Sequence, residues 1–136
     1  MRILLVEDQK DVAISSQKIL EILGHEVRLA MNGGEALGIA QGYTPDVALI
    51  DMGLPDMCGT LVGSELRQLP KWGAVFLIAL TGYNYEDECY RIGFDFFQHK
   101  PMNFRELPDI VAGGSRNPRR ALTPADTQVS DDATRQ

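Results

Sequence analysis

The chain has 136 residues, a length typical of one domain, and 13 basic against 19 acidic residues give it a net charge of −6. Nucleic acids are held through their phosphates by a basic protein face, so this composition argues against direct nucleic-acid binding. A membrane-spanning helix needs about 20 consecutive apolar residues, and the longest apolar run, residues 74–80, is far shorter. Two cysteines are too few for a disulfide framework, and the acidic Glu7-Asp8 pair interrupts any signal peptide, which together favour a cytoplasmic protein.

The composition changes at Gly113. Residues 1–112 alternate short apolar runs with amphipathic stretches, whereas residues 113–136 contain few large apolar side chains. Such a segment buries too little surface to offset the conformational entropy that ordering would cost. We therefore expect one folded domain over residues 1–112, followed by a disordered polar tail over residues 113–136.

Strands and helices are predicted to alternate through the folded part. In chain order we expect a strand at 3–6, a helix at 11–23, a strand at 27–30, a helix at 34–41, a strand at 47–50, a helix at 60–69, a strand at 75–80, a helix at 85–92, a weaker strand at 95–99 and a last helix after Asn103. Three of the strand runs are continuously apolar, as is typical of strands covered on both faces of a parallel sheet.

Two of the predicted helices carry specific signals. The first has an apolar face on which Val12, Ile19 and their neighbours at helical spacing lie, and Gly24 supplies a left-handed stop. The last contains Pro108, which lacks the amide that an inner helical turn needs, so this helix should be short, bent or late in starting.

Strands that alternate with helices predict an α/β fold with right-handed crossovers and a doubly wound, open parallel sheet. Five strands of this kind most often take the order 2-1-3-4-5, with a crevice between the first and third strands.

Polar residues follow four of the predicted strands directly. Glu7 and Asp8 follow the first, Asp51 the third, Thr81 the fourth and Lys100 the fifth. In a parallel sheet these positions meet at the carboxyl edge, so three carboxylates, a hydroxyl and an ammonium should gather there. Crowded carboxylates repel one another, and a divalent cation such as magnesium, which prefers oxygen ligands, relieves the repulsion.

With these residues in these places, the sequence resembles the response-regulator receiver domain of two-component signalling, which has a flavodoxin-like fold. The residues that carry the resemblance are the acidic pair Glu7-Asp8, the phosphoacceptor position Asp51 with Leu54, Pro55 and Gly59 in the loop after it, the pair Thr81-Gly82, and the pair Lys100-Pro101.

The resemblance implies that Asp51 is a nucleophile that takes a phosphoryl group from a histidine kinase or a histidine phosphotransfer protein. Magnesium, or manganese in its place, would be held by Asp8, by Asp51 and by the backbone carbonyl of Gly53, with Glu7 acting through a water. Lys100 would pair with the phosphoryl oxygens as a compact charge.

The resemblance also implies a conformational output. The hydroxyl of Thr81 would bond a phosphoryl oxygen, Gly82 would leave room for the group, and the Lys-Pro peptide before Pro101 would be cis. Phe97 occupies the switch position of the last strand, where it can turn inward but, lacking a hydroxyl, cannot make the bond that a tyrosine would. We expect a stand-alone receiver that relays phosphate or binds a downstream protein, and not a classical enzyme.

The sequence argues against two other functions and leaves a third open. A haloacid-dehalogenase type of phosphatase needs an acid two residues after its nucleophile, where this chain has Gly53. A flavodoxin-like flavin site needs a first loop that cradles phosphate, whereas residues 7–11 read EDQKD and would repel it. A protein-interaction module that works without phosphorylation stays open.

Overall fold

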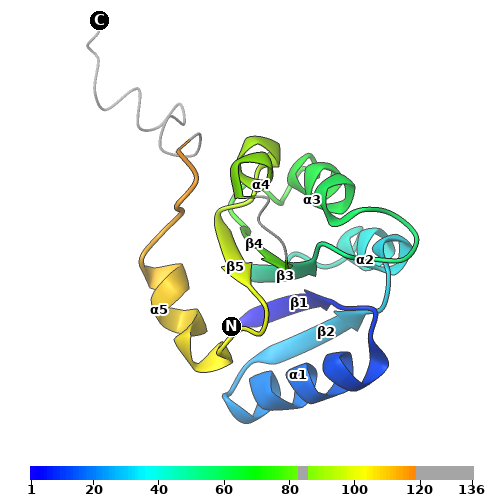
Figure 1. Cartoon of the computed structure of the whole chain (residues 1–136), viewed down its shortest axis with the longest axis vertical. Helices are drawn as coiled ribbons and strands as arrows, with labels where there is room; N and C mark the ends of the chain where they lie inside the picture. The colour runs from blue at the N-terminus through cyan, green and yellow to red at the C-terminus, as the bar shows by residue number, and fades with distance from the viewer. Residues whose placement is uncertain (83–85, 119–136) are drawn as a thin grey trace, which may run out of the picture.

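A computed structural model describes residues 1–82 and 86–118, and within them five strands form one parallel sheet (Figure 1). The strands are β1 (Arg2–Val6), β2 (Glu26–Ala30), β3 (Val47–Asp51), β4 (Phe76–Thr81) and β5 (Phe96–His99). The helices are α1 (Lys10–Ile22), α2 (Gly33–Ala40), α3 (Gly59–Arg67), α4 (Glu86–Ile92) and α5 (Leu107–Ala112), with a 3-10 turn (Phe104–Glu106) before α5. The sheet order β2-β1-β3-β4-β5 confirms the predicted topology.

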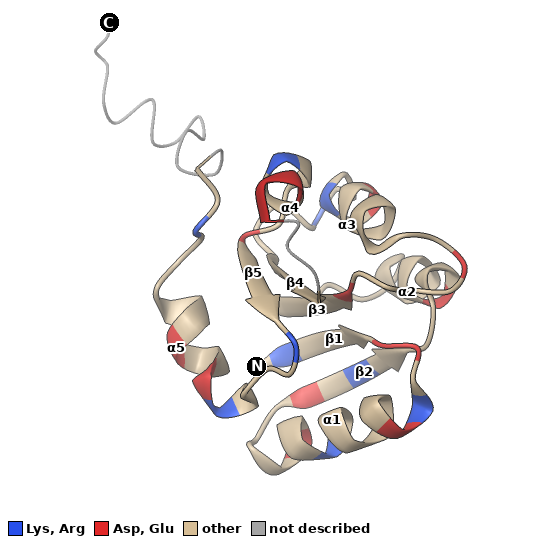
Figure 2. Ribbon diagram, viewed as in Figure 1, with Lys and Arg blue, Asp and Glu red and all other residues tan. Residues whose placement is uncertain are grey.

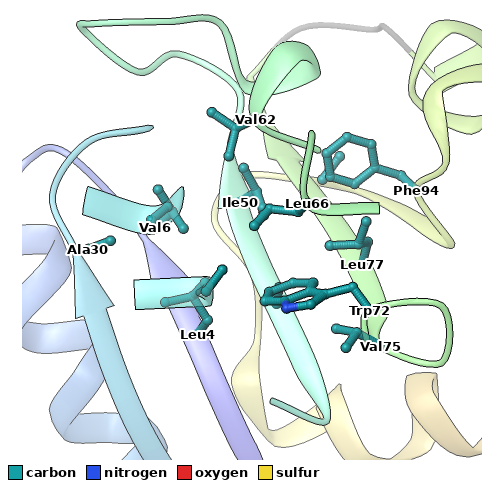
Figure 3. Close-up of a cluster of buried hydrophobic side chains, with 14 of the residues drawn as sticks. Leu4, Val6, Ala30, Ile50, Val62, Leu66, Trp72, Val75, Leu77 and Phe94 are labelled. Atoms are coloured by element: carbon teal, nitrogen blue, oxygen red, sulfur yellow. The ribbon is translucent and has the colours of Figure 1, made fainter. Parts of the chain in front are cut away.

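The helices cover both faces of the sheet. Figure 1 shows α2, α3 and α4 on one side and α1 and α5 on the other. Each side has its own apolar core. The larger core, under α2, α3 and α4, includes Trp72 and Phe94 (Figure 3), and the smaller one includes Leu20 of α1 and Leu107 of α5. Burial on both faces explains why β3 and most of β1 read as unbroken apolar runs.

The register of the strands brings their carboxyl ends level. Val6 of β1 pairs with Ile50 of β3, and Asp51 at the end of β3 pairs with Leu80 of β4. Residues that follow these strands therefore start from the same edge of the sheet. No helix of the described ranges is both long enough and apolar enough to cross a bilayer.

Helix α1 buries a narrower face than the sequence pattern predicted. Ala13, Ser16 and Leu20 are buried, whereas Val12 and Ile19 are 40% and 46% exposed. The buried positions are three and four residues apart, so they form a single line along the helix that faces the sheet. Positions beside that line, such as Val12 and Ile19, are partly exposed to solvent, and apolar spacing alone does not reveal this.

The last helix accommodates its proline by starting late. The 3-10 turn occupies residues 104–106, and α5 then runs for six residues with Pro108 in its first turn. The amides of a first turn have no partner within the helix, so the missing amide of Pro108 costs nothing there. This agrees with the prediction of a short helix that begins late.

The chain after α5 differs from the prediction of a disordered tail from Gly113. The hydroxyl of Ser115 donates to Asp95 Oδ1 at 2.7 Å, and Asn117 Nδ2 donates to the carbonyls of Tyr90 and Phe94, both at 2.6 Å. Residues 115–117, here called the C-terminal clasp, thus attach to α4 and to the two residues just before β5. The composition gave no sign of this because polar hydrogen bonds, and not apolar burial, order the segment. Residues 119–136 of the predicted tail lie outside the described residues.

Candidate functional site

The charged residues predicted to converge do lie at one edge of the sheet. Figure 2 shows acidic segments directly after β1 and at the end of β3, with a basic segment directly after β5. Glu7, Asp8 and Asp51 each offer a carboxylate oxygen, and these three oxygens lie within 4.8 Å of one another. Glu7 and Asp51 are buried, whereas Asp8 is half-buried.

Lys100 completes this acidic cluster. Its Nζ lies 3.1 Å from Glu7 Oε1 and 3.3 Å from Asp51 Oδ1, and its side chain is 32% exposed. The peptide bond between Lys100 and Pro101 is cis, and the Lys100 amide donates to the carbonyl of Thr81 at 2.9 Å. The backbone therefore anchors Lys100 to the end of β4 while its side chain reaches the acids.

The pKa values of Glu7 and Lys100 are both raised, but for different reasons. Burial, with a contribution from the neighbouring Asp51 charge, raises the pKa of Glu7 above its usual range, although the Gln9 amide and Lys100 oppose the shift. Burial works to lower the pKa of Lys100, but its bonds and charge contacts with Glu7 and Asp51 outweigh burial and raise that pKa. Without a metal, the ammonium therefore stays charged and takes up part of the repulsion among the acids.

Asp51 is the last residue of β3 and is held by the loop that follows it. The amide of Gly53 donates to Asp51 Oδ1 at 3.0 Å. The loop then returns closely to β3 at Gly59, where a Cβ atom would lie 2.6 Å from Cα of Met52 and 2.8 Å from the Asp51 carbonyl. Only glycine fits at this point, which gives a steric reason for the glycine that the motif includes.

The two predicted switch residues lie on neighbouring strands. Thr81 ends β4, is buried and pairs in register with His99, while Phe97 pairs with Ala79. The Phe97 ring is half-buried, packs against the larger core and meets the His99 ring edge-on, with centroids 5.1 Å apart. Gly82 is exposed, and among the described residues a Cβ atom there would meet nothing within 4 Å.

The donor set of this cluster suits a hard divalent cation. All three side chains offer oxygen, which magnesium and manganese prefer to nitrogen or sulfur. Neighbouring ligands of octahedral magnesium are about 3 Å apart, so oxygens within 4.8 Å of one another need only small movements to share one ion. The residues present therefore fit the metal that the sequence resemblance implied.

Sequence reasoning missed two contacts at this edge. The amide of Gln9 donates to Glu7 Oε2 at 3.1 Å, and the carboxylate of Asp56 accepts the amides of Gly33 and Gly34. Both join a carboxylate to the backbone of another residue. Such contacts leave no periodic pattern, and for Asp56 the partners are more than 20 positions away, so no sequence signal could have found them.

Comparison with known proteins identifies the family. The model of the response regulator receiver domain matches residues 3–112, which is most of the chain. This chain belongs to that family. The receiver shares 32% identity and a TM-score of 0.75 with a receiver domain protein from Methanospirillum hungatei, over 82% of this chain and 90% of that one.

Two further similarities bear on function. A response regulator from Thermotoga maritima, whose structure is in complex with Mg(2+)-BeF, shares 30% identity with this receiver at a TM-score of 0.71, over 82% of this chain and 96% of that one. The aerobic respiration control sensor protein ArcB of Escherichia coli is 33% identical over 114 residues. That match covers 82% of this receiver but only 15% of ArcB.

Proposed function

We propose that this receiver accepts a phosphoryl group on Asp51 from a phosphohistidine of a histidine kinase or a histidine phosphotransfer protein, in a magnesium-dependent reaction. The observation that carries the proposal is the arrangement of Asp51 among Glu7, Asp8 and Lys100 at one edge of the sheet. The similarity to part of ArcB, a sensor protein, supports a partner of the kinase type.

In this reaction a carboxylate oxygen of Asp51 attacks the phosphorus, the bond between phosphorus and the donor imidazole breaks, and the imidazole leaves with the bonding electrons. Magnesium, held by Asp8, Asp51 and the Gly53 carbonyl with Glu7 acting through a water, would neutralise charge on the transferred group. Lys100 already lies 3.3 Å from Asp51, so its ammonium can pair with a phosphoryl oxygen after a small movement.

The output follows from the hydroxyl of Thr81 and the ring of Phe97. When Thr81 bonds a phosphoryl oxygen, its side chain leaves space that Phe97 fills by turning inward, and this local change biases the surface formed by α4 and β5. A downstream protein would read that surface. The cytoplasmic location stays a prediction from composition.

A module that binds partners without phosphorylation is the alternative. Such a module has no need for a lysine and a threonine placed at the rim of an acidic cluster, so their presence here favours phosphorylation. Fluorine NMR with beryllofluoride, a phosphoryl analogue, tests the choice. We expect a bound fluorine signal that requires both magnesium and Asp51, and that is absent from Asp51→Asn. A folded wild type without that signal would favour the alternative.

A further inference from the structure

The carboxylate of Asp56 ties the loop that follows Asp51 to the start of α2. Asp56 Oδ1 accepts the amide of Gly33 at 2.8 Å, and Oδ2 accepts the amide of Gly34 at 2.9 Å. Figure 1 shows this loop, between β3 and α3, passing beside α2. Both oxygens are used, so the contact fixes the orientation of the loop as well as its distance from the helix.

No other described group takes these two amides. The first amides of a helix have no partner within it, and the next one in α2, that of Glu35, donates to the side chain of Asn32 at 2.8 Å. The Gly33 and Gly34 amides, in that order, lower the pKa of the Asp56 carboxyl, so Asp56 is charged where it meets the positive end of the helix. The two hydrogen bonds from Gly33 and Gly34 to Asp56, here called the tether, are therefore charge-assisted.

Apolar packing reinforces the same contact. A Cβ atom at Gly33 would lie 2.3 Å from Cγ of Met57, so the side chain of Met57 fills the space directly beside the start of α2. At the other end of the loop, the Gly53 amide is bonded to Asp51 and the Gly59 amide donates to Met52 at 3.3 Å. The loop has no helix or strand of its own between Asp51 and Gly59, so these contacts, together with the burial of Leu54 in the larger core, define its path.

We propose that Asp56 is a positioning residue of the metal site: it holds the loop against α2 so that the Gly53 carbonyl is already in place when magnesium binds. The inference rests on the proposed function, in which that carbonyl is a ligand. Asp56 follows Gly53 by only three positions, and Gly53 is held from the other side by Asp51. Once the tether is removed, magnesium must order the loop itself, and part of its binding free energy is lost to that ordering.

The test compares magnesium binding by Asp56→Ala, Asp56→Asn and a matched control, Asp46→Ala. Asp46 is another exposed aspartate whose carboxylate accepts a backbone amide, that of Arg2 at 2.7 Å, but it precedes β3 and so lies at the opposite edge of the sheet. Calorimetric titration with magnesium chloride should show affinity roughly tenfold lower for Asp56→Ala, in line with other residues that support metal ligands. Asp56→Asn keeps one acceptor oxygen and should fall between Asp56→Ala and the wild type, while Asp46→Ala should match the wild type.

Amide hydrogen exchange of the metal-free protein provides the second measurement. Gly33 and Gly34 should exchange faster in Asp56→Ala than in the wild type, which confirms that the tether is lost. If their exchange rises while magnesium affinity stays within about twofold of the wild type, Asp56 only caps α2 and the proposal is overturned. Unchanged exchange also overturns it, because the tether would then not exist in solution. A wild type that binds no magnesium would instead refute the proposed function itself.

Discussion

Lys100 Nζ lies 3.3 Å from Oδ1 of Asp51 and so joins the residue after β5 to the last residue of β3. The same ammonium also contacts Glu7 at 3.1 Å. In the metal-free protein it neutralises part of the acidic cluster, and it lies where it can meet a phosphoryl group on Asp51. Lys100 therefore competes with magnesium for the carboxylates, but it would stabilise a phosphoryl group on Asp51.

Replacing Lys100 should separate these two effects. Lys100→Met removes a positive charge next to the proposed metal ligands, so magnesium affinity should rise, by roughly threefold to tenfold because water screens the partly exposed ammonium. The extent of Asp51 phosphorylation should nevertheless fall. Calorimetry measures the first effect and mass spectrometry after exposure to acetyl phosphate the second. Weaker magnesium binding in Lys100→Met would contradict the arrangement.

The raised pKa of Glu7 predicts how stability depends on pH. Mainly through burial, the pKa of Glu7 in the folded protein lies above its ordinary value of 4.5. At pH values between 4.5 and this folded pKa, the folded state therefore binds more protons than the unfolded state. The free energy of unfolding should therefore fall as pH rises from 4.5 through the folded pKa. Glu7→Gln, which cannot titrate, should lack this part of the slope. Urea unfolding across that range without magnesium measures it, and identical slopes for both proteins would refute the prediction.

Gly63 should be intolerant of even a methyl group. A Cβ atom there would lie 2.4 Å from two ring carbons of Phe94, which is itself fully buried. Gly63→Ala should therefore destabilise the protein by about 1–3 kcal/mol through overpacking. Gly38→Ala is the matched control in α2, where a Cβ would meet nothing within 4 Å, and it should stabilise by up to about 1 kcal/mol. Denaturant unfolding measures the change in unfolding free energy for both variants. Equal changes would show that Phe94 does not contact α3.

The C-terminal clasp should be part of the folded domain. A chain that ends at Gly114 loses the Ser115 bond to Asp95, which is fully buried, and the two bonds from Asn117. Asp95 keeps Arg67, whose Nη2 lies 2.9 Å from it. Leaving buried acceptors with fewer partners should cost about 1–3 kcal/mol of unfolding free energy. A chain that ends at Pro118 should retain full stability, and equal stability of the two chains would show that the clasp contributes nothing.

The fold and the acidic cluster could be predicted because their signals are local. The strands β1, β3 and β4 are short and mostly apolar runs, and Asp51, Thr81 and Lys100 each end or directly follow a predicted strand, so strand order alone brings them together. The exposure of Val12 and Ile19 could not be predicted in the same way. It depends on how α1 sits on the sheet, and a helix of given periodicity can present its apolar face at several angles.

Asp56 and the clasp residues could not be predicted because each acts through one polar side chain on the backbone of a distant segment. Asp56 reaches Gly33 and Gly34, and Asn117 reaches Tyr90 and Phe94. In the sequence, such a residue looks like any loop aspartate or tail asparagine. Only the fold determines which unpaired backbone groups lie within its reach.

Peptide mass spectrometry of the protein after incubation with magnesium and acetyl phosphate tests the central claim most directly. The account predicts one added phosphoryl group, located on the peptide that contains Asp51, dependent on magnesium and absent from a folded Asp51→Asn variant. A folded wild-type protein that stays unmodified with magnesium present, or that carries the phosphoryl group on another residue, would contradict it.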